Sequence, residues 1–200
     1  MATKISAKDV SDLRSRTGAG MMDCKKALQE TGGDVDKAVD YLRQKGIAKA
    51  EKRAGRSARE GIIGSYVHFN GKVAVMVELN CETDFVARTD DFQALAKDIA
   101  MHIASSRPLA VTDEEVPADI LDHERSIIDK QVAESGKPEA VRAKIVEGKL
   151  KKFLQENVLL DQPFVKDDKK SVGELIKEVS GKVGEKLAVR RFARFEIGEA

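Results

Sequence analysis

The sequence has no tryptophan, few aromatic residues (4%), two cysteines and almost no net charge. With so few aromatic residues, a core must be built from Val, Ile, Leu and Ala. Cys24 and Cys81 are too few for a disulfide scaffold and are typical of a reduced, intracellular protein. Lys and Arg total 35 against 34 Asp and Glu. This balance gives no reason to expect a nucleic acid or an anionic membrane as a required partner.

Long apolar runs are also missing. No segment approaches the length of a membrane-spanning helix, and residues 1–10 contain no apolar core of a signal peptide. We therefore expect the chain to stay in the cytoplasm and to have no membrane partner. The hydrophobic content of 42% is nevertheless sufficient for a core, and 200 residues suit one or two compact domains.

The first 46 residues predict three short helices. Ser6, with an acidic residue three positions later, resembles an N-cap and would begin the first helix. A second helix is expected over residues 21–30, and a third begins at Asp34 and ends before Gly46. Helices this short are marginal alone, so we predict that they pack together as one module over residues 1–46.

Residues 47–61 combine Lys and Arg with Ala and Gly and show no apolar period. We predict a basic linker here, solvated and partly helical. The alternative is an RNA-binding arm over the wider segment Lys45–Arg59. The absence of interleaved aromatic residues for base stacking counts against that alternative.

Residues 62–200 predict a core with a small sheet. Two alternating runs joined by Asn70-Gly71, a favoured pair for a type I′ turn, predict an antiparallel hairpin over residues 62–79. Other expected elements are helices over 90–105 and 171–183, an antiparallel helical pair over 118–156, and a final strand over 187–197. The sequence thus predicts an α+β fold: a three-helix module, then an α/β core with an antiparallel sheet and packed helices.

Two of these elements allow finer predictions. The seam of the helical pair is expected to include Ile127, Ile128, Val132, Val141 and Ile145. The inward face of the last strand is expected to hold Leu187, Val189, Ala193, Phe195 and Ile197. Arg191 would fall on that same apolar face, a conflict that the pattern does not resolve.

Residues that could support enzymatic chemistry are scattered. His68, His102 and His123 lack the spacing of a metal site, and the sequence contains no phosphate-binding loop. Cys81 and His68 lie on neighbouring predicted strands and could form a nucleophilic pair, but no third orienting group is identifiable. We therefore expect no catalytic residue, no metal and no cofactor. A thiol hydrolase that uses Cys81 remains the enzymatic alternative.

Two segments are better candidates for binding surfaces. After the glycine-rich bend at residues 16–20, Met21 and Met22 place adaptable thioethers on two sides of a helix, and only one side can face the small core. A role as core filler is an equal alternative. In the other segment, Thr83 or Asp84 would cap a helix. From the residues alone, Phe85 is expected in the core, because large aromatic side chains are usually buried.

Several motifs resemble one family. Arg16–Leu28 and Asn80–Arg88 are similar to the two signatures of bacterial translation elongation factor Ts. Gln162–Val165 and Arg194–Gly198 are similar to its C-terminal region. The matches are long, occur in the family's order and span nearly the whole chain.

The resemblance implies a guanine-nucleotide exchange factor for elongation factor Tu, the GTPase that delivers aminoacyl-tRNA to the ribosome. Such a factor binds the GDP-loaded GTPase, displaces Mg²⁺ and promotes GDP release so that GTP can bind, without covalent chemistry of its own. For residues 1–46 the resemblance implies a ubiquitin-associated-like fold.

The resemblance also implies roles for particular residues. Those that dock on the GTPase would be Leu13, Arg16, Gly18, Ala19, Gly20, Met21 and Met22. The segment that dislodges Mg²⁺ would be Thr83, Asp84, Phe85 and Val86. Phe85 would insert between helices of the partner, so the resemblance reverses the expectation of a buried ring.

The chain is similar to the shorter members of this family. It ends at Ala200 with one core unit, where longer members carry two. Short members pair through their sheets into homodimers, so a homodimer is expected.

Overall fold

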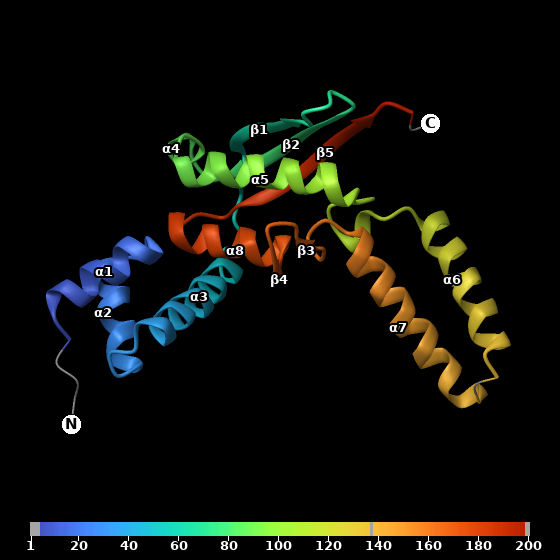
Figure 1. Ribbon diagram of the computed structural model, residues 1–200, viewed down its shortest axis with the longest axis horizontal. Helices are drawn as coiled ribbons and strands as arrows, with labels where there is room; N and C mark the ends of the chain where they lie inside the picture. Colours follow the sequence, from blue (N-terminus) through green and yellow to red (C-terminus); the bar gives the residue numbers. More distant parts are fainter. Residues whose placement is uncertain (1–4, 137, 199–200) are drawn as a thin grey trace. The chain divides into compact units, whose positions relative to one another are not determined.

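The computed structural model describes residues 5–136 and 138–198 and has the predicted α+β fold (Figure 1). In chain order its elements are α1 (Ala7–Thr17), α2 (Met21–Glu30), α3 (Val35–Glu51), β1 (Glu60–Val67), β2 (Val73–Cys81), α4 (Asp84–Ala87), α5 (Asp90–Ser106), η1 (Asp113–Glu115), α6 (Ala118–Glu134), α7 (Glu139–Asn157), β3 (Pro163–Phe164), β4 (Asp167–Ser171), α8 (Val172–Val183) and β5 (Ala188–Glu196).

The chain divides into two compact units that do not follow its order. The first contains the residues up to Ile62 together with Leu79–Leu95 and Glu174–Ala188. The second contains Ile63–Glu78, Ala96–Gly173 and the residues from Val189 onward. The predicted division into a 1–46 module, a 47–61 linker and a 62–200 core stays a prediction.

In the first unit, α1, α2 and α3 surround a small core. Ser6 caps α1: its side chain accepts the N–H of Asp9, and the Asp9 carboxylate accepts the N–H of Ser6. Asp34 caps α3 by accepting the N–H of Lys37. The buried residues among these helices are Val10, Leu13, Cys24, Ala27, Leu28 and Ala38. The three predicted helices are confirmed.

The third helix is longer than predicted. It continues through Gly46 to Glu51, so the start of the predicted linker is helical. A Cβ on Gly46 would lie 3.7 Å from the Cα of Gly181 in α8, and a Cβ on Gly181 would lie 2.8 Å from the Cα of Gly46. Glycine here allows two helices of the first unit to approach closely. The prediction that Gly46 ends the helix is therefore wrong.

The β1–β2 hairpin is confirmed, but its turn differs from the prediction. Arg107 is the only non-glycine residue with a positive φ in the part of the chain that the structure describes. Asn70 therefore lacks the left-handed conformation that a type I′ turn requires at both central positions. Only Gly71 adopts it (φ 69°), and the hydrogen bond from His68 N–H to Val73 O (2.9 Å) leaves four loop residues.

The sheet of strand order β1-β2-β5 has one covered and one open face. Val75 and Val77 of the alternating β2 run point into the core. Gly64 faces α5 so closely that a Cβ there would lie 2.9 Å from the Cβ of Ala96. The opposite face exposes apolar side chains, which we call the open sheet face: Ile63, Val67, Met76, Phe195 and Ile197.

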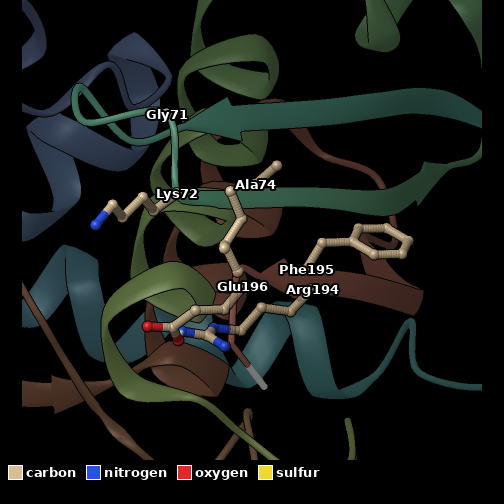
Figure 2. Close-up of a pocket in the computed structure, with 7 residues that line it drawn as sticks. Gly71, Lys72, Ala74, Arg194, Phe195 and Glu196 are labelled. Atoms are coloured by element: carbon tan, nitrogen blue, oxygen red, sulfur yellow. Dashed lines mark hydrogen bonds and ion pairs between the residues drawn. The ribbon is translucent and has the colours of Figure 1, made fainter. Parts of the chain in front are cut away.

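Leu187, just before β5, is buried as predicted (7% exposed), but from Ala193 onward the strand presents the opposite face to the one predicted. Phe195 and Ile197, expected inside, are 64% and 75% exposed, and Ala193 is exposed as well. Figure 2 shows the Phe195 ring pointing away from the adjacent Arg194 and Glu196 side chains.

Charge pairing explains how polar residues occupy the inner side of β5. Arg194 and Arg107 both contact the carboxylate of Glu196. The buried guanidinium of Arg194 and the carboxylate of Glu196 are therefore each paired with an opposite charge. On the outer side, Arg191 contacts Glu78 (2.8 Å). Because side chains alternate along a strand, choosing the wrong starting residue reverses every one of them. The conflict over Arg191 disappears with the corrected face.

The helical pair α6–α7 is confirmed, and the two helices lie side by side (Figure 1). Its seam contains buried Ile128, Val132 and Val146 with Ile145 packed against them. Ile127 and Val141 are 36% and 41% exposed, so they were wrongly placed in the seam. Ile127 and Ile128 are adjacent and cannot both face the neighbouring helix.

A second, two-stranded sheet pairs β3 with β4 in antiparallel orientation. Gln162, next to β3 and only 3% exposed, contacts His102 Nε2 (2.9 Å) and donates to the carbonyls of Ser106 (3.1 Å) and Glu156 (2.8 Å). Burial lowers the pKa of His102, and its Nδ1 accepts the N–H of Val165 (3.2 Å). Gln162 and Phe164 of the motif at residues 162–165 therefore belong to the core, whereas Pro163 and Val165 are exposed.

Candidate partner-binding site

A one-turn helix, α4, follows the end of β2. Thr83 is its N-cap, with extended backbone angles (φ −131°, ψ 155°) and a side-chain oxygen that accepts the N–H of Val86 (3.4 Å). Asp84 lies in the first turn and contacts Arg88 (2.8 Å). Of the two predicted caps, Thr83 is the one observed. We call Thr83–Val86 the exposed turn.

Phe85, at the centre of the exposed turn, is 79% exposed. The interpretation from the residues alone, that its ring is buried, is wrong. Ala87 supplies the buried contact of this short helix instead (6% exposed), and Val86 is half-buried. A single exposed apolar side chain is common on protein surfaces. What distinguishes Phe85 is how firmly the backbone beside it is held.

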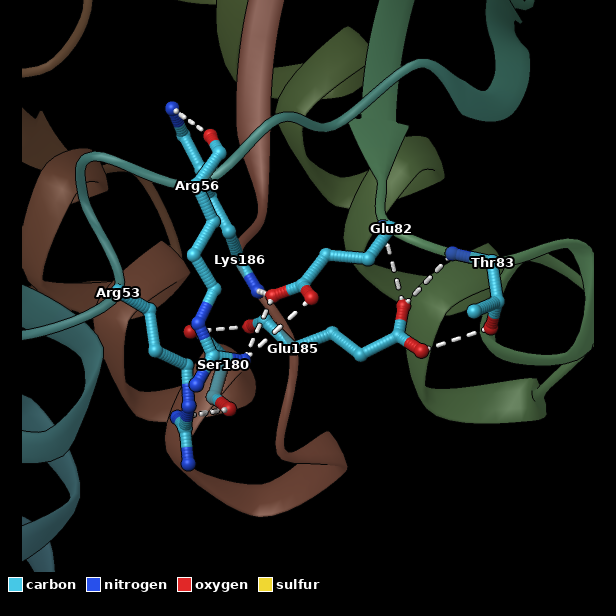
Figure 3. A network of polar contacts seen from close by, with 7 residues as sticks. All are labelled: Arg53, Arg56, Glu82, Thr83, Ser180, Glu185 and Lys186. Carbon is cyan, nitrogen blue, oxygen red and sulfur yellow. Dashed lines mark hydrogen bonds and ion pairs between the residues drawn. The ribbon is translucent and has the colours of Figure 1, made fainter.

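The backbone that leads into the exposed turn is held by two carboxylates (Figure 3). Glu185 Oε2 accepts the N–H groups of Glu82 and Thr83 (3.0 Å each), and Oε1 accepts the Thr83 hydroxyl (2.7 Å). In return, the Glu82 carboxylate accepts the N–H of Lys186 (2.7 Å) and contacts Arg56 (3.3 Å). The Lys186 N–H and the Arg56 charge lower the pKa of Glu82.

A second layer of contacts supports this arrangement. Ser180 donates its hydroxyl to the carbonyl of Glu185, and Arg53 donates to the carbonyl of Ser180 (3.3 Å). The Lys186 ammonium donates to the carbonyl of Arg56 (2.8 Å). Residues from the predicted linker and from the end of α8 therefore converge beneath the exposed turn (Figure 3).

The same contacts bear on the RNA-binding alternative. Arg53 and Arg56, two basic residues of the proposed arm, bind groups within the chain. Lys45 and Lys49 both contact the Asp23 carboxylate (2.9 and 2.8 Å), and these two lysines lower its pKa. Four basic side chains of the segment thus bind groups of the same chain. Few of its positive charges are left to bind RNA.

The thiol-hydrolase alternative fails at Cys81. Its side chain is completely buried, and its thiol donates to the carbonyl of Thr83 (3.1 Å). Burial and the nearby Glu185 carboxylate raise the pKa of the thiol to about 11, so the nucleophilic thiolate is scarce at neutral pH. His68 instead contacts the Tyr66 hydroxyl (3.0 Å). Cys81 supports the exposed turn and has no features of a nucleophile.

The two methionines are the first residues of α2, directly after the loop that follows α1. Met21 and Met22 are 45% and 75% exposed, so the core-filler alternative is wrong for both. Arg16 is exposed and contacts Asp36 (3.0 Å). Leu13, by contrast, is completely buried. Its side chain belongs to the core beneath this surface and cannot itself touch a partner.

Gly18 ends α1 in the left-handed conformation (φ 68°). A Cβ at this position would lie 2.2 Å from the Lys182 side chain, which packs over the glycine. The Lys182 ammonium contacts Asp91 in α5 (2.7 Å). Within the first unit, the end of α8 therefore touches both Gly18, in the loop before Met21, and the start of α5, the helix that follows the exposed turn.

No motif in the sequence marks Lys182, Glu185 or Lys186 as part of this site. Thr83 and Glu185 are 102 residues apart in the chain, and no local pattern marks a contact between two such distant positions. Gly184, with a positive φ of 82°, was the one local signal that the chain turns after α8. It does not indicate which segment the following residues reach.

Two further observations concern metal binding and membrane spans. Across residues 5–136 and 138–198, no group of three or more His, Cys, Asp or Glu side chains is arranged to hold a metal ion. No helix within this described part has both the length and the apolar character to span a membrane. The exposed turn presents an aromatic ring, with the exposed Asp84–Arg88 ion pair beside it, and these groups suit binding to a protein.

Comparison with known proteins identifies relatives over nearly the full chain. A family model described as "Elongation factor TS" matches residues 8–199. Elongation factor Ts of Solidesulfovibrio magneticus is 56% identical over 195 residues, which cover 98% of each chain. That of Thermosipho melanesiensis is 56% identical over 98% of this chain and 100% of the relative. That of Desulforamulus reducens is 55% identical over 98% and 90%.

Proposed function

Because the chain belongs to the elongation factor Ts family, the nucleotide exchange factors of elongation factor Tu in translation elongation, we propose that its exposed turn, Thr83–Val86, is the segment that dislodges Mg²⁺ and loosens GDP. Like the family, the protein performs no covalent chemistry of its own. We place its action in the cytoplasm, where translation takes place. The observation that carries the proposal is the 79% exposure of Phe85 on a turn whose backbone is fixed.

Nucleotide exchange sets an energetic condition. A factor that bound the GDP-loaded and the empty GTPase equally would shift nothing. It must bind the empty form more tightly, and nucleotide then weakens its binding by the same ratio. Mg²⁺ links the diphosphate to oxygen ligands of a GTPase, so its displacement removes much of the hold on GDP.

The exposed turn alone is insufficient for this task. A thousandfold loosening of GDP requires about 4 kcal/mol of differential binding. Burial of one phenylalanine side chain in the partner contributes about 1.5–3 kcal/mol. We infer that the remaining differential binding energy comes from the surface around Met21 and Met22, which binds the GTPase while Phe85 inserts. Leu13 supports that surface from below, and Arg16 with Gly18–Gly20 forms its edge.

Replacing Met21 and Met22 together with Ala is expected to weaken the complex about tenfold or more, because two exposed thioethers lose their contact with the partner. The melting temperature of the chain should change by less than about 3 °C, since neither side chain is buried. Calorimetric titration with elongation factor Tu, beside a melting curve, measures both. A large drop in melting temperature with unchanged affinity would return the methionines to a core role.

We also propose that the protein forms a homodimer through the open sheet face. This face exposes Ile63, Val67, Met76, Phe195 and Ile197 on neighbouring strands. Apolar side chains gathered on one face of a sheet favour burial against a second copy, because a two-fold interface brings the same residues together. The Arg191–Glu78 ion pair on the same side suits the polar rim of such an interface.

The experiment that tests the proposed function is the release of a fluorescent GDP from elongation factor Tu. Adding the protein should accelerate release strongly when Mg²⁺ is present. When a chelator has already removed Mg²⁺, the remaining acceleration should be much smaller, since the exposed turn would have no ion to displace. Equal acceleration with and without Mg²⁺ would contradict the proposed role of the turn.

A further inference from the structure

Resting on the proposed function of the exposed turn, we propose that Glu185 is its positioning residue: this carboxylate fixes the backbone before Phe85 so that the ring is presented to the GTPase. Three hydrogen bonds converge on the carboxylate, from the N–H groups of Glu82 and Thr83 (3.0 Å each) and from the Thr83 hydroxyl (2.7 Å). Hydrogen bonds to an ionised acceptor are about twice as strong as those between neutral groups.

Thr83 links the Glu185 carboxylate to the backbone on the far side of Phe85. Its hydroxyl donates to Glu185 and accepts the N–H of Val86 (3.4 Å). The hydroxyl therefore connects the residue two positions before the ring to the residue one position after it. Figure 3 shows the Glu185 side chain extended toward Thr83. Both ends of the short segment that carries Phe85 depend on one carboxylate.

The exposed turn needs an external anchor. The helix α4 has four residues, and a single helical turn is unstable by itself. Phe85 is too exposed for packing of its own ring to hold it. The direction in which the Cα–Cβ bond of Phe85 points must therefore come from the backbone. A ring that is already oriented binds at lower entropic cost, and a turn that adopts the right conformation only part of the time loses apparent activity by that fraction.

Glu185 is itself well held. Its carbonyl accepts the Ser180 hydroxyl, and the next residue, Lys186, donates its N–H to Glu82 (2.7 Å). Residues 82–83 and 185–186 thus bind each other in both directions. This reciprocal arrangement gives the exposed turn a fixed support within the first unit of the structure.

Replacing Glu185 with Ala is expected to lower the maximal rate of stimulated GDP release on the order of tenfold, since several charge-assisted hydrogen bonds are lost. Glu185→Gln should keep most of the rate, because its amide oxygen can accept both backbone N–H groups. Glu185→Asp should behave like Ala, because its carboxylate is one methylene too short. Stopped-flow release at saturating factor measures all three.

A second readout does not depend on the GTPase. Hydrogen exchange of the Glu82 and Thr83 amides should accelerate at least about tenfold in the Glu185→Ala and Glu185→Asp variants and stay slow in Glu185→Gln. If the Ala variant fails to fold, as judged by circular dichroism, the comparison of Asp with Gln decides. Equal release rates and equal amide protection in those two variants would overturn the role of Glu185.

A double-mutant cycle separates this inference from the function on which it rests. In a chain that already carries Phe85→Ala, adding Glu185→Ala should slow GDP release little further, because the carboxylate acts through the ring. If both single changes slow release and their effects multiply, Glu185 does not act by positioning Phe85. If Phe85→Ala slows release and Glu185→Ala does not, the inference fails and the function stands. If Phe85→Ala itself has no effect, the proposed function fails.

Discussion

Replacing Phe85 with Ala is expected to slow stimulated GDP release from elongation factor Tu by about 10- to 100-fold at saturating factor. The change removes the one large apolar side chain of the exposed turn, and with it about 1.5–3 kcal/mol of burial that is gained only when the ring enters the partner. Stopped-flow measurement of fluorescent GDP release gives the maximal rate directly.

The fold should tolerate this change. Phe85 is 79% exposed, so the melting temperature is expected to move by less than about 2 °C. Phe69 provides a matched control, because it is the same residue type, is 93% exposed and lies in the β1–β2 loop. Phe69→Ala should leave GDP release unchanged. Near wild-type release by the Phe85 variant would remove this ring from the mechanism.

Replacing Phe195 with Asp is expected to convert the proposed homodimer into a monomer. The substitution would place an unpaired carboxylate in an apolar interface, and because the interface is two-fold it would do so twice. We expect the dimer dissociation constant to rise by at least about 100-fold. Sedimentation velocity over a range of concentrations measures it.

The matched control for this prediction is Val141→Asp. Val141 is 41% exposed on α7, outside the open sheet face, so the same new charge there should leave the dimer intact. If the unchanged protein is monomeric at concentrations of tens of micromolar, the open sheet face is not a self-association surface. If both variants remain dimeric, the dimer uses another surface.

Local signals predicted much of the fold. The bounds of α2 are those expected from the sequence, because caps, glycine breaks and the apolar period act within a few residues. Ser6 and Asp34 cap their helices as predicted. The buried side of β2 followed from its strict alternation, which leaves only one apolar face to choose.

Predictions failed where distant contacts decide the structure. Gly46 lies within α3 because Gly181 packs against it, and no local rule shows that. The face of β5 depended on ion pairs that place Arg194 and Glu196 on the inner side. The strand β4, Asp167–Ser171, is too polar to show an apolar alternation and was not predicted.

In the candidate site, too, local features were predictable from the sequence and distant contacts were not. Thr83 as a cap was readable from the sequence. The residues alone placed Phe85 in the core, and only the family resemblance favoured an exposed ring. Glu185 could not be found by either route, since its role depends on a contact across 102 residues. Local chemistry defines the turn, and tertiary structure defines its orientation.

The central claim is that the Phe85 ring leaves water and enters the GTPase. Its most direct test is the fluorine NMR signal of the protein with a 4-fluorophenylalanine at position 85, free and bound to nucleotide-free elongation factor Tu. In the free protein the signal should respond to exchange of H₂O for D₂O, as an exposed ring does. We expect that response to disappear in the complex, and a signal that remains fully solvent-sensitive there would contradict the account.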